Sequence, residues 1–134
     1  MGISGSLRTG SYNTALLEIA RQVAPAGTEM TVADLSEFTA YNEDVYKQGF
    51  PPSVTVFRER ITAADCLLIA TPEYNYGMPG VLNNAIDWAS RPPDQPIDGK
   101  PIEQNLLRQA LVGLNGQFVT RPQVFINSAL QNFD

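Results

Sequence analysis

One stretch of the sequence decides the fold: Cys66-Leu67-Leu68-Ile69-Ala70-Thr71-Pro72-Glu73-Tyr74-Asn75-Tyr76-Gly77-Met78-Pro79-Gly80. Its first five residues are all apolar, which is typical of a strand that is buried on both faces of a sheet. The remaining residues form a loop that is rich in tyrosine, glycine and proline. The stretch therefore predicts a parallel strand whose carboxyl end opens into an unusual loop.

Helix and strand patterns alternate on both sides of this stretch. Apolar residues at spacings of three and four predict helices within residues 15–23, 54–64, 81–89 and 106–114. Short apolar segments predict further strands at residues 1–3, 30–35 and 124–126, and loops are expected over 36–52 and 91–101. We expect the first helix to begin at an N-cap on Ser11 or Asn13 and to end at Pro25-Ala26-Gly27. The alternation implies an α/β fold with a parallel sheet and helices on both of its faces.

The composition excludes several classes of protein. The chain has 134 residues, of which 43% are hydrophobic, enough for one domain with a real core. Its formal net charge of −5 argues against a module that binds nucleic acid. The absence of histidine removes every mechanism that uses an imidazole base, and the single cysteine excludes a disulfide framework. We expect Cys66 to be a small buried residue rather than a nucleophile.

Two further absences concern the cellular location. No apolar run approaches the roughly 20 residues that a membrane-spanning helix needs, and the first residues do not have the pattern of a signal peptide. The expectation is therefore a cytoplasmic protein without a membrane partner. Any chemistry must come from backbone groups, hydroxyls, carboxylates, amides or a bound cofactor.

The loop from Ser4 to Asn13 has the character of a phosphate site. It follows the first predicted strand and leads into a helix, whose N-terminus favours an anion. Hydroxyl and amide donors come from Ser4, Ser6, Ser11, Asn13 and Thr14, and Arg8 adds the only cation. The spacing is neither that of a Walker loop nor the Gly-x-Gly-x-x-Gly pattern of a dinucleotide site. The alternative interpretation is an ordinary turn with a helix cap.

The loop from Thr71 to Gly80 has the character of a platform for a flat ring. Pro72 and Pro79 restrict the backbone, and polarisable apolar surface comes from Tyr74, Tyr76 and Met78. Both loops follow strands, so they belong on the carboxyl edge of the sheet, where ligands bind in such folds. Together they would hold an aromatic ring joined to a phosphate, as in flavin mononucleotide (FMN). The alternative is a structural loop that covers the sheet end or an interface.

Four residues near the second loop are expected to have structural roles. Hydride transfer between a nicotinamide and a flavin needs no acid and base pair, because the cofactor supplies the chemistry. We therefore expect Glu73 to form an ion pair with Arg91, and Asp87 to serve the structure of its helix. Trp88 is expected in the core or in an interface.

The two loops and the helix after the second loop together resemble a known family. The motifs are Gly5-Ser6-Leu7-Arg8 with Ser11 and Asn13, Thr71-Pro72-Glu73-Tyr74-Asn75 through Pro79-Gly80, and Asn84-Ala85-Ile86-Asp87-Trp88-Ala89-Ser90-Arg91. In this order and spacing they resemble the NADPH-dependent FMN reductase family, which includes quinone, chromate and azo-dye reductases.

The resemblance implies a three-layer flavodoxin-like fold, with residues 1–134 as one FMN-binding domain. The FMN would be noncovalent, with its phosphate held by Ser6, Arg8, Ser11, Asn13 and Thr14 and its ring lined by Pro72, Glu73, Tyr74 and Asn75. Neither a metal nor a catalytic side chain is expected, because the FMN would pass two electrons from NADPH or NADH to a small acceptor by a ping-pong mechanism. The acceptor would be a quinone, a flavin, a metal oxyanion or an azo compound, and the protein would be a homodimer or homotetramer.

The sequence departs from the family pattern in two places. Asn83 stands where the family usually has lysine. After Gly99-Lys100-Pro101 a strand and a Gly-rich loop are missing, and the chain runs from Ile102-Glu103-Gln104 almost directly into the last predicted helix. Two alternatives to an enzyme therefore stay open, a flavodoxin-like electron carrier and a non-enzymatic interaction module with the same fold.

Overall fold

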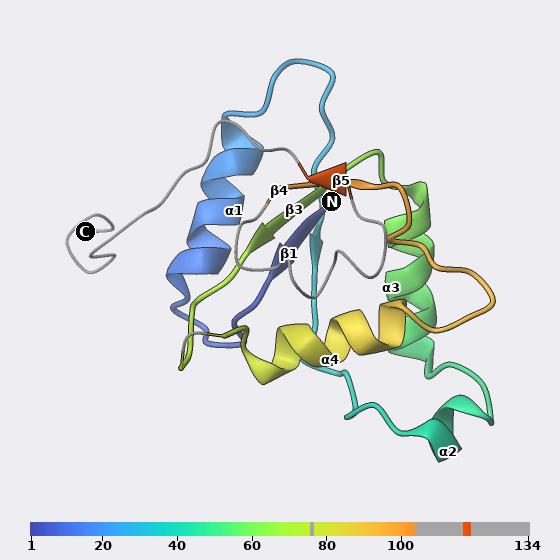
Figure 1. Cartoon of the computed structure of the whole chain (residues 1–134). Coiled ribbons are helices and arrows are strands. Elements are labelled where there is room, and N and C mark those ends of the chain that lie inside the picture. Colours follow the sequence, from blue (N-terminus) through green and yellow to red (C-terminus); the bar gives the residue numbers. More distant parts are fainter. Residues whose placement is uncertain (76, 104–116, 119–134) are drawn as a thin grey trace.

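The strands form a parallel sheet in the computed structural model of the chain, which describes residues 1–75, 77–103 and 117–118 (Figure 1). The strand order is β2-β1-β3-β4-β5. The strands are β1 (Gly2–Ser4), β2 (Val32–Ala33), β3 (Leu67–Ala70), β4 (Pro101–Glu103) and β5 (Gln117–Phe118). This is the order of a flavodoxin-like sheet, in which the direction of strand addition reverses between β1 and β3.

Helices cover both faces of the sheet, which gives the expected three layers (Figure 1). The helices are α1 (Tyr12–Gln22), α2 (Glu43–Tyr46), α3 (Pro52–Ala63) and α4 (Gly80–Ala89). α1 packs on β1 and β3, whereas α3 and α4 pack against each other on the opposite face. None of the helices in the described part of the chain is long and apolar enough to cross a membrane.

The main hydrophobic core lies between the sheet and the pair α3 and α4. The sheet contributes Ile3, Leu67 and Ile69, and the helices contribute side chains including Phe57, Ile61, Leu82 and Ala85. On the other face Leu17 of α1 is fully buried, and its Cδ2 lies 3.4 Å from where a side chain on Gly2 would begin. Trp88 is also fully buried, as expected from its place on α4.

A buried arginine ties the middle of α3 to the C-terminal end of α4. The Arg58 guanidinium on α3 donates hydrogen bonds to the carbonyl oxygens of Trp88, Ala89 and Asp94, at 2.9 and 2.7 Å for the first two. It also lies 4.2 Å from the ring centre of Phe50. The cation therefore satisfies carbonyl groups at the C-terminus of α4, where a positive charge also complements the helix dipole.

Several local predictions can be compared with these elements. Ser11 is the N-cap of α1, and its hydroxyl accepts a hydrogen bond from the Thr14 amide. The prediction that Cys66 is buried was wrong: Cys66 is exposed, because β3 begins one residue later. The stretch expected to be a loop over 36–52 contains α2, which Asn42 caps by accepting a hydrogen bond from the Asp44 amide.

The chain after Lys100 also differs from expectation. A strand, β4, begins at Pro101 and pairs with β3 through Leu67 and Ile102. It is short, and its partner β5 was not predicted. The helix predicted at 106–114, the strand predicted at 124–126 and the place of the family's Gly-rich loop lie outside the described residues.

Candidate functional site

The two loops singled out in the sequence meet at the carboxyl edge of the sheet. Ser4 is in register with Ala70 at the ends of β1 and β3. Immediately beyond, the Gly5 amide donates a 2.8 Å hydrogen bond to the carbonyl oxygen of Ala70. A side chain on Gly5 would lie 2.2 Å from Oγ1 of Thr71, so the contact leaves no room for one. The first loop therefore rests directly on the start of the second.

Hydroxyl groups hold the first loop against α1. The buried Ser4 hydroxyl lies 2.9 Å from Oγ1 of Thr14 and accepts a 3.3 Å hydrogen bond from the Ser6 amide. The Ser6 hydroxyl in turn accepts a 3.4 Å hydrogen bond from the Arg8 amide. Ser11 is 5% exposed and caps α1. The small polar residues of the loop thus fix its backbone rather than point into solvent.

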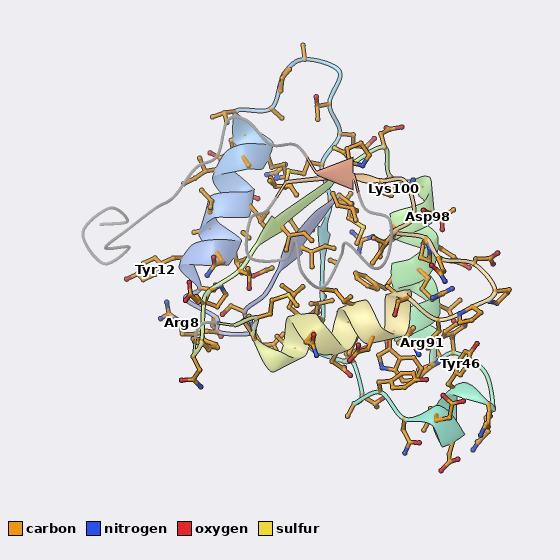
Figure 2. All side chains as sticks on the ribbon, in the orientation of Figure 1. Arg8, Tyr12, Tyr46, Arg91, Asp98 and Lys100 are labelled. Carbon is orange, nitrogen blue, oxygen red and sulfur yellow. The ribbon has the colours of Figure 1, made fainter. Side chains whose placement is uncertain are left out.

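The rim of this loop offers positive charge and unused donors. Figure 2 shows Arg8 beside Tyr12 at the start of α1, and the guanidinium lies 5.2 Å from the centre of the tyrosine ring. Within the described ranges, the amides of Thr9, Gly10 and Asn13 make no hydrogen bond. The first turn of α1 contains no acidic residue. An anion would therefore find a cation, open amides and the positive end of a helix, with no carboxylate competing for them.

The second loop is a tight hairpin with an exposed aromatic ring. The amides and carbonyls of Tyr74 and Gly77 pair with each other at 3.0 and 2.9 Å. Asn75 lies in this turn with a φ of 51°, a left-handed conformation that asparagine tolerates better than most residues. Tyr74 is 59% exposed, and Glu73 and Asn75 are exposed beside it. The loop presents an exposed aromatic surface with polar groups beside it.

The sequence-predicted residues divide between these two loops. One group surrounds the start of α1: Ser6, Arg8, Ser11, Asn13 and Thr14. The other lies after β3 and consists of Pro72, Glu73, Tyr74 and Asn75. The Gly5 contact joins the two groups at their bases, so both loops belong to one edge of the sheet, as expected.

The expected ion pair between Glu73 and Arg91 was wrong. Glu73 precedes α4 and Arg91 follows it, so a helix of ten residues, about 15 Å long, separates them. Arg91 instead donates to the carbonyl oxygen of Asp87 and to the Ser90 hydroxyl, each at 3.0 Å. In the part of the chain that the structure describes, the ion pairs are Arg21–Glu18 and Lys47–Glu43.

Sequence reasoning missed the attachment of the segment after β2 to α4. Asn84 and Trp88 both donate hydrogen bonds to the carbonyl oxygen of Thr39, at 2.9 Å each. The spacing of Asn84 and Trp88 could have indicated a shared partner, because residues four apart lie on the same side of a helix. The spacing did not identify Thr39 as that partner, since Thr39 lies 45 residues before Asn84.

Comparison with known proteins places the chain among flavin enzymes. Residues 1–103 match the model of the family described as NADPH-dependent FMN reductase. An NAD(P)H-dependent FMN reductase of Pseudomonas aeruginosa is 53% identical over 148 aligned positions, which include the whole of this chain and 80% of the relative. The quinone reductase of Escherichia coli K12 is 40% identical over 96% of this chain and 76% of its own length. Because the first alignment is longer than the 134 residues of this chain, that relative has residues without a counterpart here.

A solved structure agrees with the same grouping. The flavoenzyme NAD(P)H:(acceptor) oxidoreductase FerB of Paracoccus denitrificans superimposes with a TM-score of 0.85 and 31% sequence identity. The superposition covers 93% of this chain and 76% of that protein.

Proposed function

Because the chain belongs to the NADPH-dependent FMN reductase family, an oxidoreductase family that uses FMN and NAD(P)H, we propose that it reduces a quinone-type acceptor at the expense of NAD(P)H. The relatives named quinone reductases support this acceptor class. The single observation that supports the site is the junction of the two loops through Gly5 and Ala70. This junction brings the loop that we propose for the phosphate next to the loop that we propose for the ring.

The phosphate of FMN fits the first loop. The guanidinium of Arg8, the hydroxyls of Ser6 and Ser11 and the open amide of Asn13 are donors of the kind that a phosphate accepts from. The hydroxyl of Thr14 stands one position further along α1. A dianionic phosphate here would also gain from the positive end of the α1 dipole.

The isoalloxazine ring fits the second loop. Pro72 and Tyr74 supply apolar surface at one side, and Glu73 and Asn75 bring backbone and side-chain polar groups to its edge. The hairpin fixed by the Tyr74–Gly77 pair holds this surface rigidly. The polar rim of an isoalloxazine needs such groups at its edge, while its faces need apolar contact.

The protein itself would supply binding and orientation rather than a catalytic side chain. A bound FMN would supply the two-electron chemistry between NADPH or NADH and the acceptor. The two loops would hold the ring so that donor and acceptor reach the same open face in turn. Other small acceptors, namely a free flavin, a metal oxyanion or an azo compound, would use the same face.

We also propose that residues 1–134 act as one domain and that the protein is a homodimer or homotetramer. Leu7 is 55% and Tyr74 59% exposed, and these large side chains flank the site on its two loops. A second copy of the chain that covered them would remove apolar surface from water at the edge of the site. Size-exclusion chromatography with light scattering measures the mass that tests this.

Steady-state kinetics test the proposed reaction. The protein is loaded with FMN, and NADPH or NADH oxidation is followed at several concentrations of 1,4-benzoquinone. Parallel lines in double-reciprocal plots, together with stoichiometric formation of the hydroquinone, are expected for a ping-pong reductase. An FMN-loaded protein that does not oxidise NAD(P)H would instead act as an electron carrier, and a protein that binds no FMN would fit only an interaction module.

A further inference from the structure

The segment after β2 is fastened to α4 by one asparagine side chain. Asn84 Oδ1 accepts a 2.7 Å hydrogen bond from the Tyr41 amide, and its Nδ2 donates a 2.9 Å hydrogen bond to the carbonyl oxygen of Thr39. A single side chain thus satisfies a backbone donor and a backbone acceptor two residues apart. A backbone that is bound in this way has little freedom to shift along the helix.

Aromatic packing strengthens the same attachment. The Trp88 indole donates a second 2.9 Å hydrogen bond to the Thr39 carbonyl oxygen. The rings of Tyr41 and Trp88 pack edge to face with centroids 4.9 Å apart, and the Arg91 guanidinium lies 5.0 Å from the centre of the Tyr41 ring. We call the segment Thr39–Tyr41 the clamped segment.

The clamped segment lies at the same edge of the sheet as the two loops. It follows β2, the neighbour of β1, and all strands of the described sheet are parallel, so the chain leaves each of them at one edge. The second loop ends at Pro79, the N-cap of α4, and Asn84 stands five residues further along. At a rise of 1.5 Å per residue the clamp is only about 8 Å from the end of that loop.

We propose that Asn84 is a positioning residue. It fixes the clamped segment as one side of the space where the acceptor would meet the second loop, Thr71 to Gly80. This inference rests on the proposed function. Thr39 and the neighbouring Ala40 are exposed, so the wall is available to a small molecule. Asn84 would act through the backbone that it holds, because both polar atoms of its side chain are already used within the protein.

The test compares Asn84→Ala with Asn83→Ala. Asn83 is the exposed neighbour on the same helix, and among the described residues its side chain makes no hydrogen bond. For Asn84→Ala, loss of two hydrogen bonds should raise the KM for 1,4-benzoquinone about fivefold or more, with kcat little changed. The Kd for FMN should stay within about twofold of wild type, because neither loop is altered. Asn83→Ala should match wild type in all three quantities.

A second variant keeps the inference testable if Asn84→Ala does not fold. Asn84→Asp can still accept from the Tyr41 amide but places a carboxylate oxygen against the Thr39 carbonyl. It should raise the same KM while binding FMN normally. An unchanged KM for benzoquinone in a folded, FMN-loaded Asn84 variant would overturn the inference and leave the proposed function standing. A wild-type protein that binds no FMN would overturn both.

Discussion

The amide of Gly5 donates a 2.8 Å hydrogen bond to the carbonyl oxygen of Ala70, and this contact joins the two loops that surround the proposed site. Gly5 lies just beyond the end of β1, and Ala70 is the last residue of β3. The strand order of the sheet reverses between these two strands. Thr71 closes the space beside the contact. The position of the first loop relative to the second is therefore set by backbone atoms, which few substitutions can change.

Gly5→Ala should separate the two loops. The new methyl group would lie 2.2 Å from Oγ1 and 2.7 Å from Cβ of Thr71, so the backbone has to move. We expect the Kd for FMN to rise about tenfold or more, together with a loss of stability of roughly 1–3 kcal/mol. Both are measured by flavin fluorescence quenching and thermal unfolding. Gly80→Ala is the control, because open space surrounds that position; equal FMN affinity in the two variants would show that the contact does not position the site.

Arg8→Ala should weaken FMN binding through the phosphate. A hydrogen bond to a charged group contributes about 1.5–3 kcal/mol, which corresponds to a rise of roughly ten- to hundredfold in Kd. Because Arg8 is exposed, the effect is expected at the low end of this range and should shrink as salt is added. Riboflavin lacks the phosphate, so its affinity should not change. A variant that lost affinity for riboflavin as strongly as for FMN would remove Arg8 from the phosphate site.

Ser11→Ala should affect both the helix and the cofactor. The hydroxyl caps α1 by accepting from the Thr14 amide, and loss of such a cap costs about 1 kcal/mol of stability. Asn42→Ala removes the equivalent cap of α2, away from both loops, and serves as the matched control. The two variants should lose similar stability, but only Ser11→Ala should raise the Kd for FMN. If the Kd rises equally in both, the effect of Ser11 comes from stability alone.

Arg58→Met should destabilise the fold without touching the site. The substitution leaves the carbonyl oxygens of Trp88 and Ala89 without their buried donor, and burial already lowers the pKa of this guanidinium. We expect a loss of about 3 kcal/mol, seen as a fall of roughly 10 °C in Tm. Arg21→Ala breaks an exposed ion pair with Glu18 and should change Tm by little. A Tm for Arg58→Met close to that of Arg21→Ala would contradict the structural role.

The carboxyl group of Glu18 should titrate well below its usual range. Hydrogen bonds from Arg21 and Gln22 lower its pKa from 4.5 to about 2. Because the folded-state pKa is depressed, the contribution of this pair is present above the unfolded pKa and is lost as the pH falls through about 2. NMR titration of the Glu18 side-chain carboxyl carbon measures the value directly. In Arg21→Ala the pKa should move back toward 4.5, and a pKa that does not move would show that Arg21 is not the cause.

Much of the fold follows from local sequence patterns. The apolar run ending at Ala70 gave β3, and the spacing of apolar residues gave α1, α3 and α4 close to their observed bounds. Periodicity detects these elements because each buries a continuous face or stripe. It failed for α2, which has four residues and buries none of them. Periodicity also placed Cys66 inside a strand that begins one residue later, because an apolar run does not show at which residue the strand begins.

The site could be predicted only as two separate loops. Their composition indicated a phosphate cradle and a ring platform, and the alternation of elements placed them on one edge. The contact of Gly5 with Thr71 was hidden, because nothing in either loop specifies how closely two strands of the sheet bring them. The attachment of Thr39 to Asn84 was hidden for the same reason: a hydrogen bond between distant residues leaves no periodic signal. Arg58 resembled an ordinary surface arginine until its carbonyl partners were known.

Titration of the wild-type protein with FMN, followed by anaerobic addition of NADPH, tests the central claim most directly. The account predicts saturable binding of one FMN per chain, seen as quenched flavin fluorescence, and bleaching of the flavin absorbance by one equivalent of NADPH. FMN that keeps its free fluorescence at every protein concentration would contradict it, because the junction of the two loops would then hold no cofactor.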